Sequence, residues 1–142
     1  MLDKVKISID VMGGDNSPYK TLEGLNLFAK RNQNINDYIF YLFGDETIIN
    51  QKLSNFKYLE NNYKIFDTKI VVSNELSAMS SIKKGKNSSM WKAIQSQIDL
   101  SANVTLSAGN TGVLLVMSKM ILKTLENVDK PALAGLWPNE NN

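Results

Sequence analysis

Short runs of apolar residues along the chain predict five β-strands. Between residues 5 and 11, valine or isoleucine occupies every second position, a period of two that predicts a strand with one apolar and one polar face. The uncharged run 38–43 is aromatic and β-branched, as in interior strands. Further strands are expected over 69–73, around 104–107 and over 132–137.

The first helix is expected after the first strand. Asp15 or Ser17 is a suitable N-cap, and Pro18 suits the first helical position because its missing N–H costs little there. The buried stripe of this helix is predicted to consist of Leu22, Leu25, Phe28 and Ala29.

Three further helices are expected, over 46–53, from 88 to about 98 and from 111 to about 126. In the helix from 88, Asn87 or Ser88 can cap the N-terminus, and the apolar residues share one face. The helix from 111 is apolar nearly all round, which favours burial on both sides, either in the core or across a subunit contact. Residues 54–67 show no clear pattern, and 75–86 combine a helical turn with a lysine-rich loop.

Strands that alternate with helices predict a three-layer α/β/α fold with a mainly parallel sheet. Ligands in such folds bind outside the carboxyl ends of the strands. Three loops of small residues are expected at that edge: Gly13–Asp15, Gly44–Asp45 and Ser107–Gly112. The chain lacks both a Gly-X-Gly-X-X-Gly and a Walker A sequence, which disfavours NAD and nucleoside triphosphates as ligands.

Composition removes several kinds of chemistry. The 142 residues include no cysteine and no histidine, which excludes thiolate nucleophiles, imidazole bases and disulfides and disfavours a zinc site, so no metal is expected. A formal net charge of +2 is too small to indicate a nucleic-acid partner. Neither a secretory signal nor an 18-residue apolar stretch is present, so we expect one soluble, cytoplasmic domain over residues 1–142.

The segment from Val104 to Gly112 is the strongest candidate for a binding loop. Its small side chains allow a ligand to approach the backbone, and the next helix offers unpaired N–H groups to an anion. An equally weighted alternative is a tight β-to-α turn, in which Gly109 has a positive φ and Asn110 or Thr111 caps the helix.

A second anion site is suggested just before the helix that starts near residue 88. Lys83, Lys84 and Lys86 precede the hydroxyls of Ser88 and Ser89, and this combination would hold a phosphate. A capped helix beside a solvated lysine run is the better explanation of these residues alone. The second anion-friendly loop, at Ser107 to Gly112, raises the weight of the phosphate interpretation.

Two carboxylates could act on a proton or orient a substrate. Asp10 lies on the polar face of the first predicted strand, and Asp15 follows the glycine pair. For Asp15, capping the helix is the stronger interpretation.

Five segments in one order carry a family resemblance: 9–18 (Ile-Asp-Val-Met-Gly-Gly-Asp-Asn-Ser-Pro), 44–45 (Gly-Asp), 86–90 (Lys-Asn-Ser-Ser-Met), 107–112 (Ser-Ala-Gly-Asn-Thr-Gly) and 130–134 (Lys-Pro-Ala-Leu-Ala). In order and spacing they resemble the phosphate acyltransferases of bacterial phospholipid synthesis. The Met-Gly-Gly-Asp and Ser-Ala-Gly-Asn-Thr-Gly words are specific in combination. One departure is Asn16, where the family usually has a histidine.

The resemblance implies transfer of a fatty acyl group from acyl carrier protein to inorganic phosphate. The acyl phosphate formed is then used by a membrane acyltransferase. The resemblance implies no cofactor and no nucleic-acid partner. It implies a homodimer that is located in the cytoplasm or at the inner face of the membrane. Because phosphate is itself a nucleophile, direct attack on a thioester needs positioning and oxyanion donors rather than an enzyme nucleophile.

The implied site has two sets of residues. Catalytic roles are expected for Asp10, Asp15 and Asn110. Phosphate or substrate binding is expected for Gly13, Gly14, Lys84, Lys86, Ser88, Ser89, Gly109, Thr111 and Gly112.

Family members are much longer, so the chain is similar to only their N-terminal part, and much of the acyl and carrier-protein surface would come from the remainder. Two alternatives stay open. A related phosphate-binding enzyme, such as a phosphotransacetylase or a decarboxylating hydroxy-acid dehydrogenase, could share the loops. A folded fragment that dimerises without turnover would also fit.

Overall fold

Four parallel strands form one sheet in the order β3-β2-β1-β4. The computed structural model describes residues 3–59, 62–72 and 85–135. Within these residues the elements are β1 (Val5–Asp10), α1 (Tyr19–Arg31), η1 (Ile35–Asp37), β2 (Tyr38–Gly44), α2 (Glu46–Leu53), η2 (Lys57–Leu59), β3 (Tyr63–Asp67), α4 (Ser89–Asp99), β4 (Val104–Ser107) and α5 (Thr111–Leu122).

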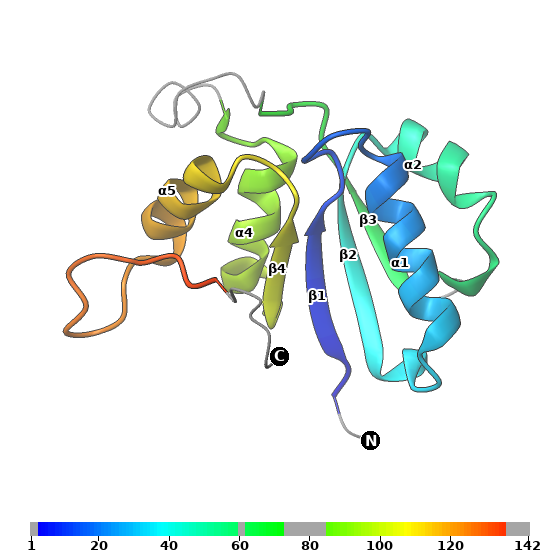
Figure 1. Ribbon diagram of the computed structural model, residues 1–142, viewed down its shortest axis with the longest axis horizontal. Coiled ribbons are helices and arrows are strands. Elements are labelled where there is room, and N and C mark those ends of the chain that lie inside the picture. Colours follow the sequence, from blue (N-terminus) through cyan, green and yellow to red (C-terminus); the bar gives the residue numbers. More distant parts are fainter. Residues whose placement is uncertain (1–2, 60–61, 73–84, 136–142) are drawn as a thin grey trace, which may run out of the picture.

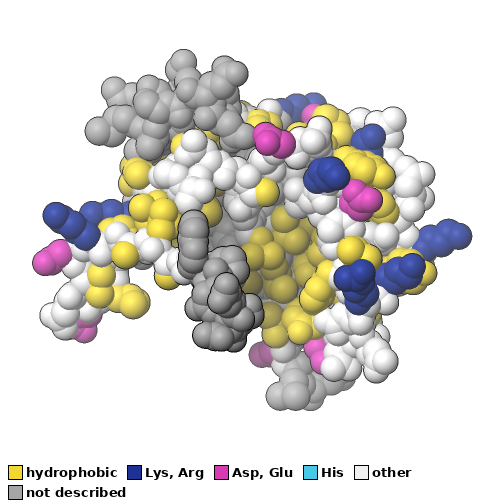
Figure 2. Space-filling model, in the orientation of Figure 1, with side chains coloured by type: hydrophobic (Ala, Val, Ile, Leu, Met, Phe, Trp, Pro, Cys, Tyr) yellow, Lys and Arg dark blue, Asp and Glu magenta, His cyan; other side chains and the backbone are white. Residues whose placement is uncertain are grey.

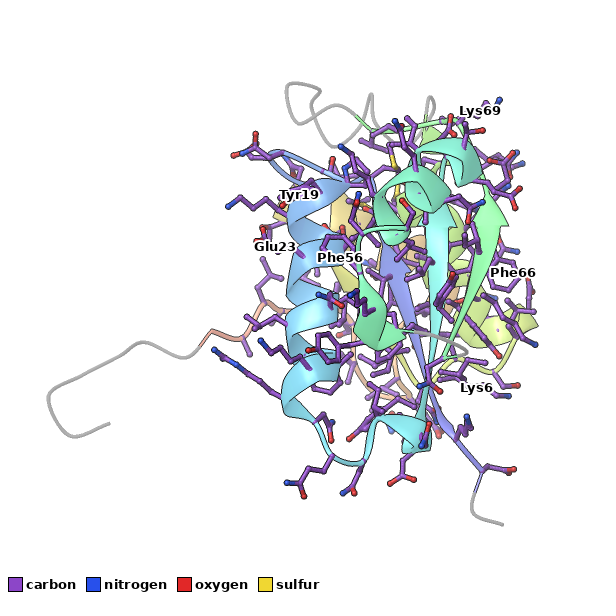
Figure 3. The ribbon with its side chains drawn as sticks, turned by 90° about the vertical axis from the view of Figure 1, so that its right-hand side faces the viewer. Lys6, Tyr19, Glu23, Phe56, Phe66 and Lys69 are labelled. Carbon is purple, nitrogen blue, oxygen red and sulfur yellow. The ribbon has the colours of Figure 1, made fainter. Side chains whose placement is uncertain are left out.

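Helices cover both faces of the sheet, which confirms the predicted α/β fold with three layers (Figure 1). On one face, Leu22 and Leu25 of α1 and Ile49 of α2 pack with Ile9 and Phe40 of the sheet. A side view shows this layer, with Tyr19 of α1 beside Phe56 (Figure 3). The opposite face is covered by α4, against which α5 packs.

Both faces of β1 are buried, although only one of them is apolar in sequence. Ser8 is 0% exposed and Asp10 is 1% exposed. The Ser8 hydroxyl donates to the Ala93 carbonyl of α4 at 2.9 Å, so the polar group is satisfied within the core. The chain crosses from β3 to the far side of β1, and this crossover places α4 over the polar face.

The register aligns the carboxyl ends of the strands. Asp10, the last residue of β1, pairs with Phe43 of β2 and with Ser107 at the end of β4. The loops that follow β1 and β4 therefore leave the sheet side by side, and the N-terminus of α4 reaches the same edge (Figure 1). The three predicted small-residue loops thus follow β1, β2 and β4.

The prediction of a strand over 69–73 is wrong for residues 69–72, and residue 73 lies outside the described residues. The third strand is β3, Tyr63–Asp67, in the segment for which no pattern was apparent. Tyr63 and Ile65 pack on one face of the sheet and Phe66 on the other, so the pattern is one of burial on both sides. The Ile-Val-Val run lies beyond the strand, and its Ile70 and Val71 are each 45% exposed.

The predicted start of α1 also needs correction. Neither Asp15 nor Ser17 caps the helix, and Pro18 precedes the first helical residue. The Ser17 hydroxyl donates back to the Met12 carbonyl at 2.7 Å. N–H groups in the first turn of the helix donate to backbone carbonyls instead, as the Lys20 N–H does to the Asn16 carbonyl at 3.2 Å.

Two predicted buried stripes are only partly buried. Leu22, Leu25 and Ala29 of α1 lie in the core, but Phe28 is 41% exposed. In α4, Met90 and Ile94 are buried whereas Ile98 is 58% exposed.

The last helix is shorter and less buried than predicted. It ends at Leu122 rather than near residue 126, and only Val113 and Met117 are fully buried. Met120 is 50% exposed. Burial on one side results because α5 contacts α4 and lies beside rather than over the sheet (Figure 1).

The remaining predictions divide into three groups. The helix over 46–53 is confirmed as α2, and Asp45 caps it by accepting from the Thr47 N–H at 2.9 Å. The described part of the fifth predicted strand, residues 132–135, contains no strand. The rest of that strand, and most of the segment 75–86, lie outside the described residues.

Candidate active site at the carboxyl edge of β1 and β4

A buried carboxylate lies at the centre of the loop edge. The Ser107 hydroxyl donates to Asp10 Oδ2 at 2.7 Å, and the Gly109 N–H donates to Ser107 Oγ at 3.1 Å. The other oxygen, Asp10 Oδ1, is buried and has no hydrogen-bond partner among the described residues. A buried polar atom without a hydrogen bond lowers the stability of the folded protein, so this oxygen is a candidate to bind a substrate group.

The loop geometry around Asp10 requires glycine at two positions. A Cβ on Gly13 would collide with Asp10 Oδ2 and lie 3.0 Å from the Gly109 nitrogen. Gly14 has a φ of +90°, which disfavours any side chain, and a Cβ there would lie 2.7 Å from the Ala108 carbonyl oxygen. The glycine pair therefore lets the loop after β1 pack directly on the loop after β4.

Burial raises the pKa of Asp10 above its ordinary value of 3.8, because desolvation penalises the charged form. Ser107, the Ser89 hydroxyl and backbone groups of Met12 and Gly13 act in the opposite direction by stabilising the carboxylate. Of these, Ser107 is hydrogen-bonded to Asp10, through Oδ2, and the others act as nearby dipoles that leave Oδ1 without a hydrogen bond. Desolvation is the larger effect. The carboxyl group is therefore poised to hold or transfer a proton at a higher pH than an exposed aspartate.

The N-terminus of α4 is buried, and the N–H groups of Ser89 and Trp91 have acceptors within the protein. Ser88 is the N-cap and its Oγ accepts from the Trp91 N–H at 3.2 Å, as the capping prediction requires. The Ser89 N–H donates to the Ile70 carbonyl at 3.0 Å. Ser88 and Ser89 are 0% and 1% exposed, so this helix end offers little to a ligand.

The N-terminus of α5 has the opposite character. Asn110 is the N-cap, and its Oδ1 accepts from the Val113 N–H at 3.1 Å. Thr111 and Gly112 are exposed, and their N–H groups have no acceptor among the described residues. Capping by Asn110 is confirmed, whereas the expected positive φ at Gly109 is wrong; of the described glycines, only Gly14 has one.

The structure separates the predicted site residues. It brings together Asp10, Gly13, Ser89 and Gly109, with Gly14 in the adjoining turn. Asn110 follows on the same loop as Gly109, and Thr111 and Gly112 are the first residues of α5. The Gly109 N–H is already donated to Ser107, so a phosphate or oxyanion role for that N–H is disfavoured. Asp15 and Lys86 are exposed, and Lys84 lies outside the described residues.

Ser107 is the residue that sequence reasoning missed. It was considered only as a small side chain that leaves room for a ligand, yet it holds the Asp10 carboxylate directly. The sequence shows a hydroxyl at the last position of a predicted strand. That this hydroxyl reaches Asp10 could not be predicted, because it requires β4 to pair with β1 in this register.

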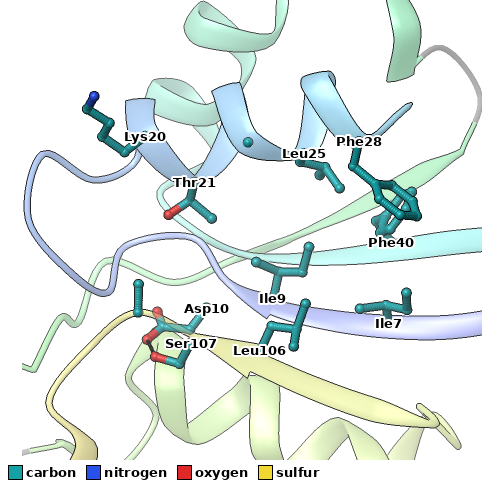
Figure 4. Close-up of a pocket in the computed structure, with 12 residues that line it drawn as sticks. Ile7, Ile9, Asp10, Lys20, Thr21, Leu25, Phe28, Phe40, Leu106 and Ser107 are labelled. Carbon is teal, nitrogen blue, oxygen red and sulfur yellow. Dashed lines mark hydrogen bonds between the residues drawn. The ribbon is translucent and has the colours of Figure 1, made fainter. Parts of the chain in front are cut away.

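An apolar groove begins at the same carboxylate. Its volume is about 440 Å³, and it runs between α1 and the strands β1 and β4 (Figure 4). Asp10, Ser107 and Ala108 form one end of the groove. The space-filling view shows the hollow as a region of hydrophobic side chains on the face turned to the viewer (Figure 2).

At one edge of its α/β fold the chain therefore combines a buried acid, an exposed helix N-terminus and an apolar groove. A family model described as "Fatty acid synthesis protein" matches residues 5–142, and the chain belongs to this family. The resemblance drawn from the loop sequences is thereby confirmed.

Relatives named phosphate acyltransferase align with nearly the whole chain. The protein of Pelagibacter ubique is 44% identical over 138 residues, which cover 97% of this chain. The proteins of Rhodopseudomonas palustris (strain BisB18) and Mesorhizobium japonicum are 37% and 36% identical, over 97% and 94% of the chain. The chain spans about 40% of the length of these relatives, which are covered to 40%, 38% and 37%.

Among the described residues, no helix has the length and apolar character needed to cross a membrane.

Proposed function

We propose that this chain carries the phosphate-binding and proton-transfer part of an acyltransferase that moves a fatty acyl group from a thioester to inorganic phosphate. The observation that carries the proposal is the pairing of Asp10, with its unpartnered Oδ1, with the open N-terminus of α5 on the adjoining loop. Family membership and the phosphate acyltransferase relatives support the same reaction.

Phosphate binds at the first turn of α5 in this proposal. The N–H groups of Thr111 and Gly112 point outward from a helix N-terminus, where the partial positive charge favours an anion. Each favourable helix-end contact contributes about 0.3–1 kcal/mol, so the Thr111 hydroxyl and a lysine such as Lys86 would have to add to it.

The reaction needs no enzyme nucleophile. A phosphate oxygen forms the new bond to the thioester carbonyl carbon, and the carbon–sulfur bond breaks with its electron pair leaving on sulfur. Monohydrogen phosphate carries the proton that the thiolate must gain, so the products are an acyl phosphate and a thiol. The balance therefore requires a group that passes a proton from phosphate to sulfur.

Asp10 is suited to that transfer. Its pKa is raised by burial, and Oδ1 is the oxygen not engaged by Ser107. In its protonated form Oδ1 can donate to the leaving sulfur, and as a carboxylate it can recover a proton from phosphate. Ser107 holds the side chain in place throughout because it binds only Oδ2.

The finer parts of the proposal concern the partners. The donor is the thioester of acyl carrier protein, and the acyl phosphate passes to a membrane acyltransferase. The exposed apolar side chains of α5 and the segment after it, among them Met120, Leu122 and Leu125, support a homodimer contact.

The test is acyl phosphate formation, trapped with hydroxylamine. It is carried out on the 142-residue chain and on the same chain extended by the C-terminal part of the Pelagibacter ubique relative. We expect product from at least the extended form, with acyl carrier protein preferred over coenzyme A as carrier. Asp10→Asn should lower kcat by about 10²–10⁴-fold, the usual contribution of an acid or base. The proposal fails if neither form makes product, or if Asp10→Asn retains full activity.

A further inference from the structure

The groove beside Asp10 is apolar over most of its length. Its walls are formed by side chains of β1, α1, β2 and β4, namely Ile7, Ile9, Leu25, Phe28, Phe40 and Leu106 (Figure 4). Phe28 and Leu106 are 41% and 51% exposed in the absence of a ligand. Exposed apolar surface of this kind, gathered into one hollow, marks a binding site for an apolar group.

The polar groups of the groove lie at its end nearest the loops. Asp10 and Ser107 lie where β1 and β4 end, and Thr21 and Lys20 lie in the first turn of α1 (Figure 4). A ligand that matches this lining has a long apolar part and one polar, reactive end. The polar end would lie at the Asp10 carboxyl group.

Gly24 leaves space in the wall formed by α1. It lies in the middle of the helix and lines the groove, and a Cβ built on it would meet no atom within 4 Å. Glycine in a helix interior costs roughly 0.5–1 kcal/mol relative to alanine, and no close packing requires it here. Its presence instead keeps the groove wide.

We infer that this groove holds the alkyl chain of the fatty acyl group, with the reacting carbonyl at Asp10 and Ser107. The inference rests on the proposed function and deepens it by assigning the acyl subsite to this chain. The groove is continuous with the Asp10 site, and this continuity favours a ligand that has both an apolar part and a reactive polar end. A second copy of the chain packed on the groove would not need such an end. The family description, fatty acid synthesis, is consistent with such a ligand.

Binding is tested on the 142-residue chain with cis-parinaric acid, a fluorescent fatty acid, displaced by saturated fatty acids of eight and sixteen carbons. We expect saturable binding and tighter binding of the longer acid. Gly24→Phe should fill the groove and weaken binding of the probe and the longer acid by about tenfold or more, with a smaller effect on the shorter acid. Gly135→Phe is the matched control, since a Cβ there also meets no atom within 4 Å.

Leu106→Gln is the second variant, which keeps the test decisive if Gly24→Phe does not fold. Leu106 is exposed on β4, so the change adds a polar group to the groove wall at little cost in packing. Circular dichroism and urea unfolding check that each variant is folded. The inference is overturned by three results: no saturable binding by the wild-type chain, equal binding by Gly24→Phe and Gly135→Phe, or a concentration-dependent dimer that Gly24→Phe abolishes.

The two proposals fail separately. Fatty acid binding that Gly24→Phe weakens, without acyl phosphate formation by either enzyme form, supports the groove and overturns the proposed reaction. Acyl phosphate formation whose chain-length preference is the same in wild type and Gly24→Phe supports the reaction and overturns the groove assignment.

Discussion

The N-termini of α4 and α5 lie at the same edge of the sheet and have similar sequences, but they offer different chemistry (Figure 1). Each is capped by a polar side chain: Ser88, which follows Asn87, in α4, and Asn110 in α5. The α4 end is buried, and the N–H of its first residue is bonded to Ile70. The α5 end is exposed, and the N–H groups of its first two residues have no acceptor among the described residues.

The difference shows that the N–H groups of a helix N-terminus are available to an anion only where tertiary packing leaves them unused. At the start of α4, Ser88 caps the helix and Ser89 interacts with Asp10, so both side chains are engaged within the protein. The loop after β4 leaves the start of α5 accessible. Four experiments test or sharpen this contrast, and the largest effect is expected for proline.

Proline at the first helical position should be costly in α4 and nearly neutral in α5. The preceding residues, Ser88 and Asn110, have ψ of 167° and 120°, so both accept a following proline. Ser89→Pro removes a buried hydrogen bond and crowds a packed site, which we expect to lower the free energy of unfolding by about 2–4 kcal/mol. Thr111→Pro should change it by less than about 0.5 kcal/mol. Urea unfolding measures both, and equal losses would break the contrast.

Asp10→Asn should change how stability depends on pH. Because burial raises the pKa of Asp10 in the folded state above 3.8, the folded protein binds more protons than the unfolded chain between the two pKa values. The stability that protonated Asp10 contributes is fully present below pH 3.8 and is lost as pH rises through the folded-state pKa.

Urea unfolding of wild type and Asp10→Asn across pH 3–8 checks this prediction. The free energy of unfolding of the wild type should fall relative to that of the variant as pH rises, by up to about 1–3 kcal/mol, the usual cost of an unsatisfied buried group. A pH-independent difference would mean that the Asp10 pKa is the same in the folded and unfolded states. Asp3→Asn, at an exposed position, controls for the loss of a carboxylate.

Removing either N-cap should cost less, about 1 kcal/mol. Ser88→Ala removes a fully buried cap hydroxyl from the Trp91 N–H. Asn110→Ala removes a partly exposed cap amide from the Val113 N–H. We therefore expect the larger loss for Ser88→Ala, as measured by the midpoint of urea unfolding. A larger loss for Asn110→Ala would contradict the assignment of α4 as the buried helix end.

The smallest expected effect concerns phosphate itself. Inorganic phosphate should raise the melting temperature of the wild type in proportion to its occupancy of the α5 site. Thr111→Pro removes one N–H donor without breaking the helix, so it should reduce this stabilisation by about twofold or more. Lys119→Gln, near the other end of α5, serves as the charge control. An unchanged phosphate response in Thr111→Pro would place the anion elsewhere.

Several features of this protein followed from the sequence alone because they depend on neighbours along the chain. The alternation over residues 5–11 determined β1, and the composition of 38–43 determined an interior strand. Ser88 and Asn110 were among the cap candidates because a cap bonds to an N–H two or three positions away. The loop words were also sufficient to indicate the family.

Only the tertiary structure decided which polar residues belong to the site. Asp10 and Ser107 are 97 residues apart in sequence and meet because β4 pairs with β1 in one particular register. The alternation over β1 shows a polar face but not what covers it. The crossover places α4 over that face, and the burial raises the pKa of Asp10. The groove beside Gly24 likewise depends on where α1 lies relative to β4, a distance that no local pattern encodes.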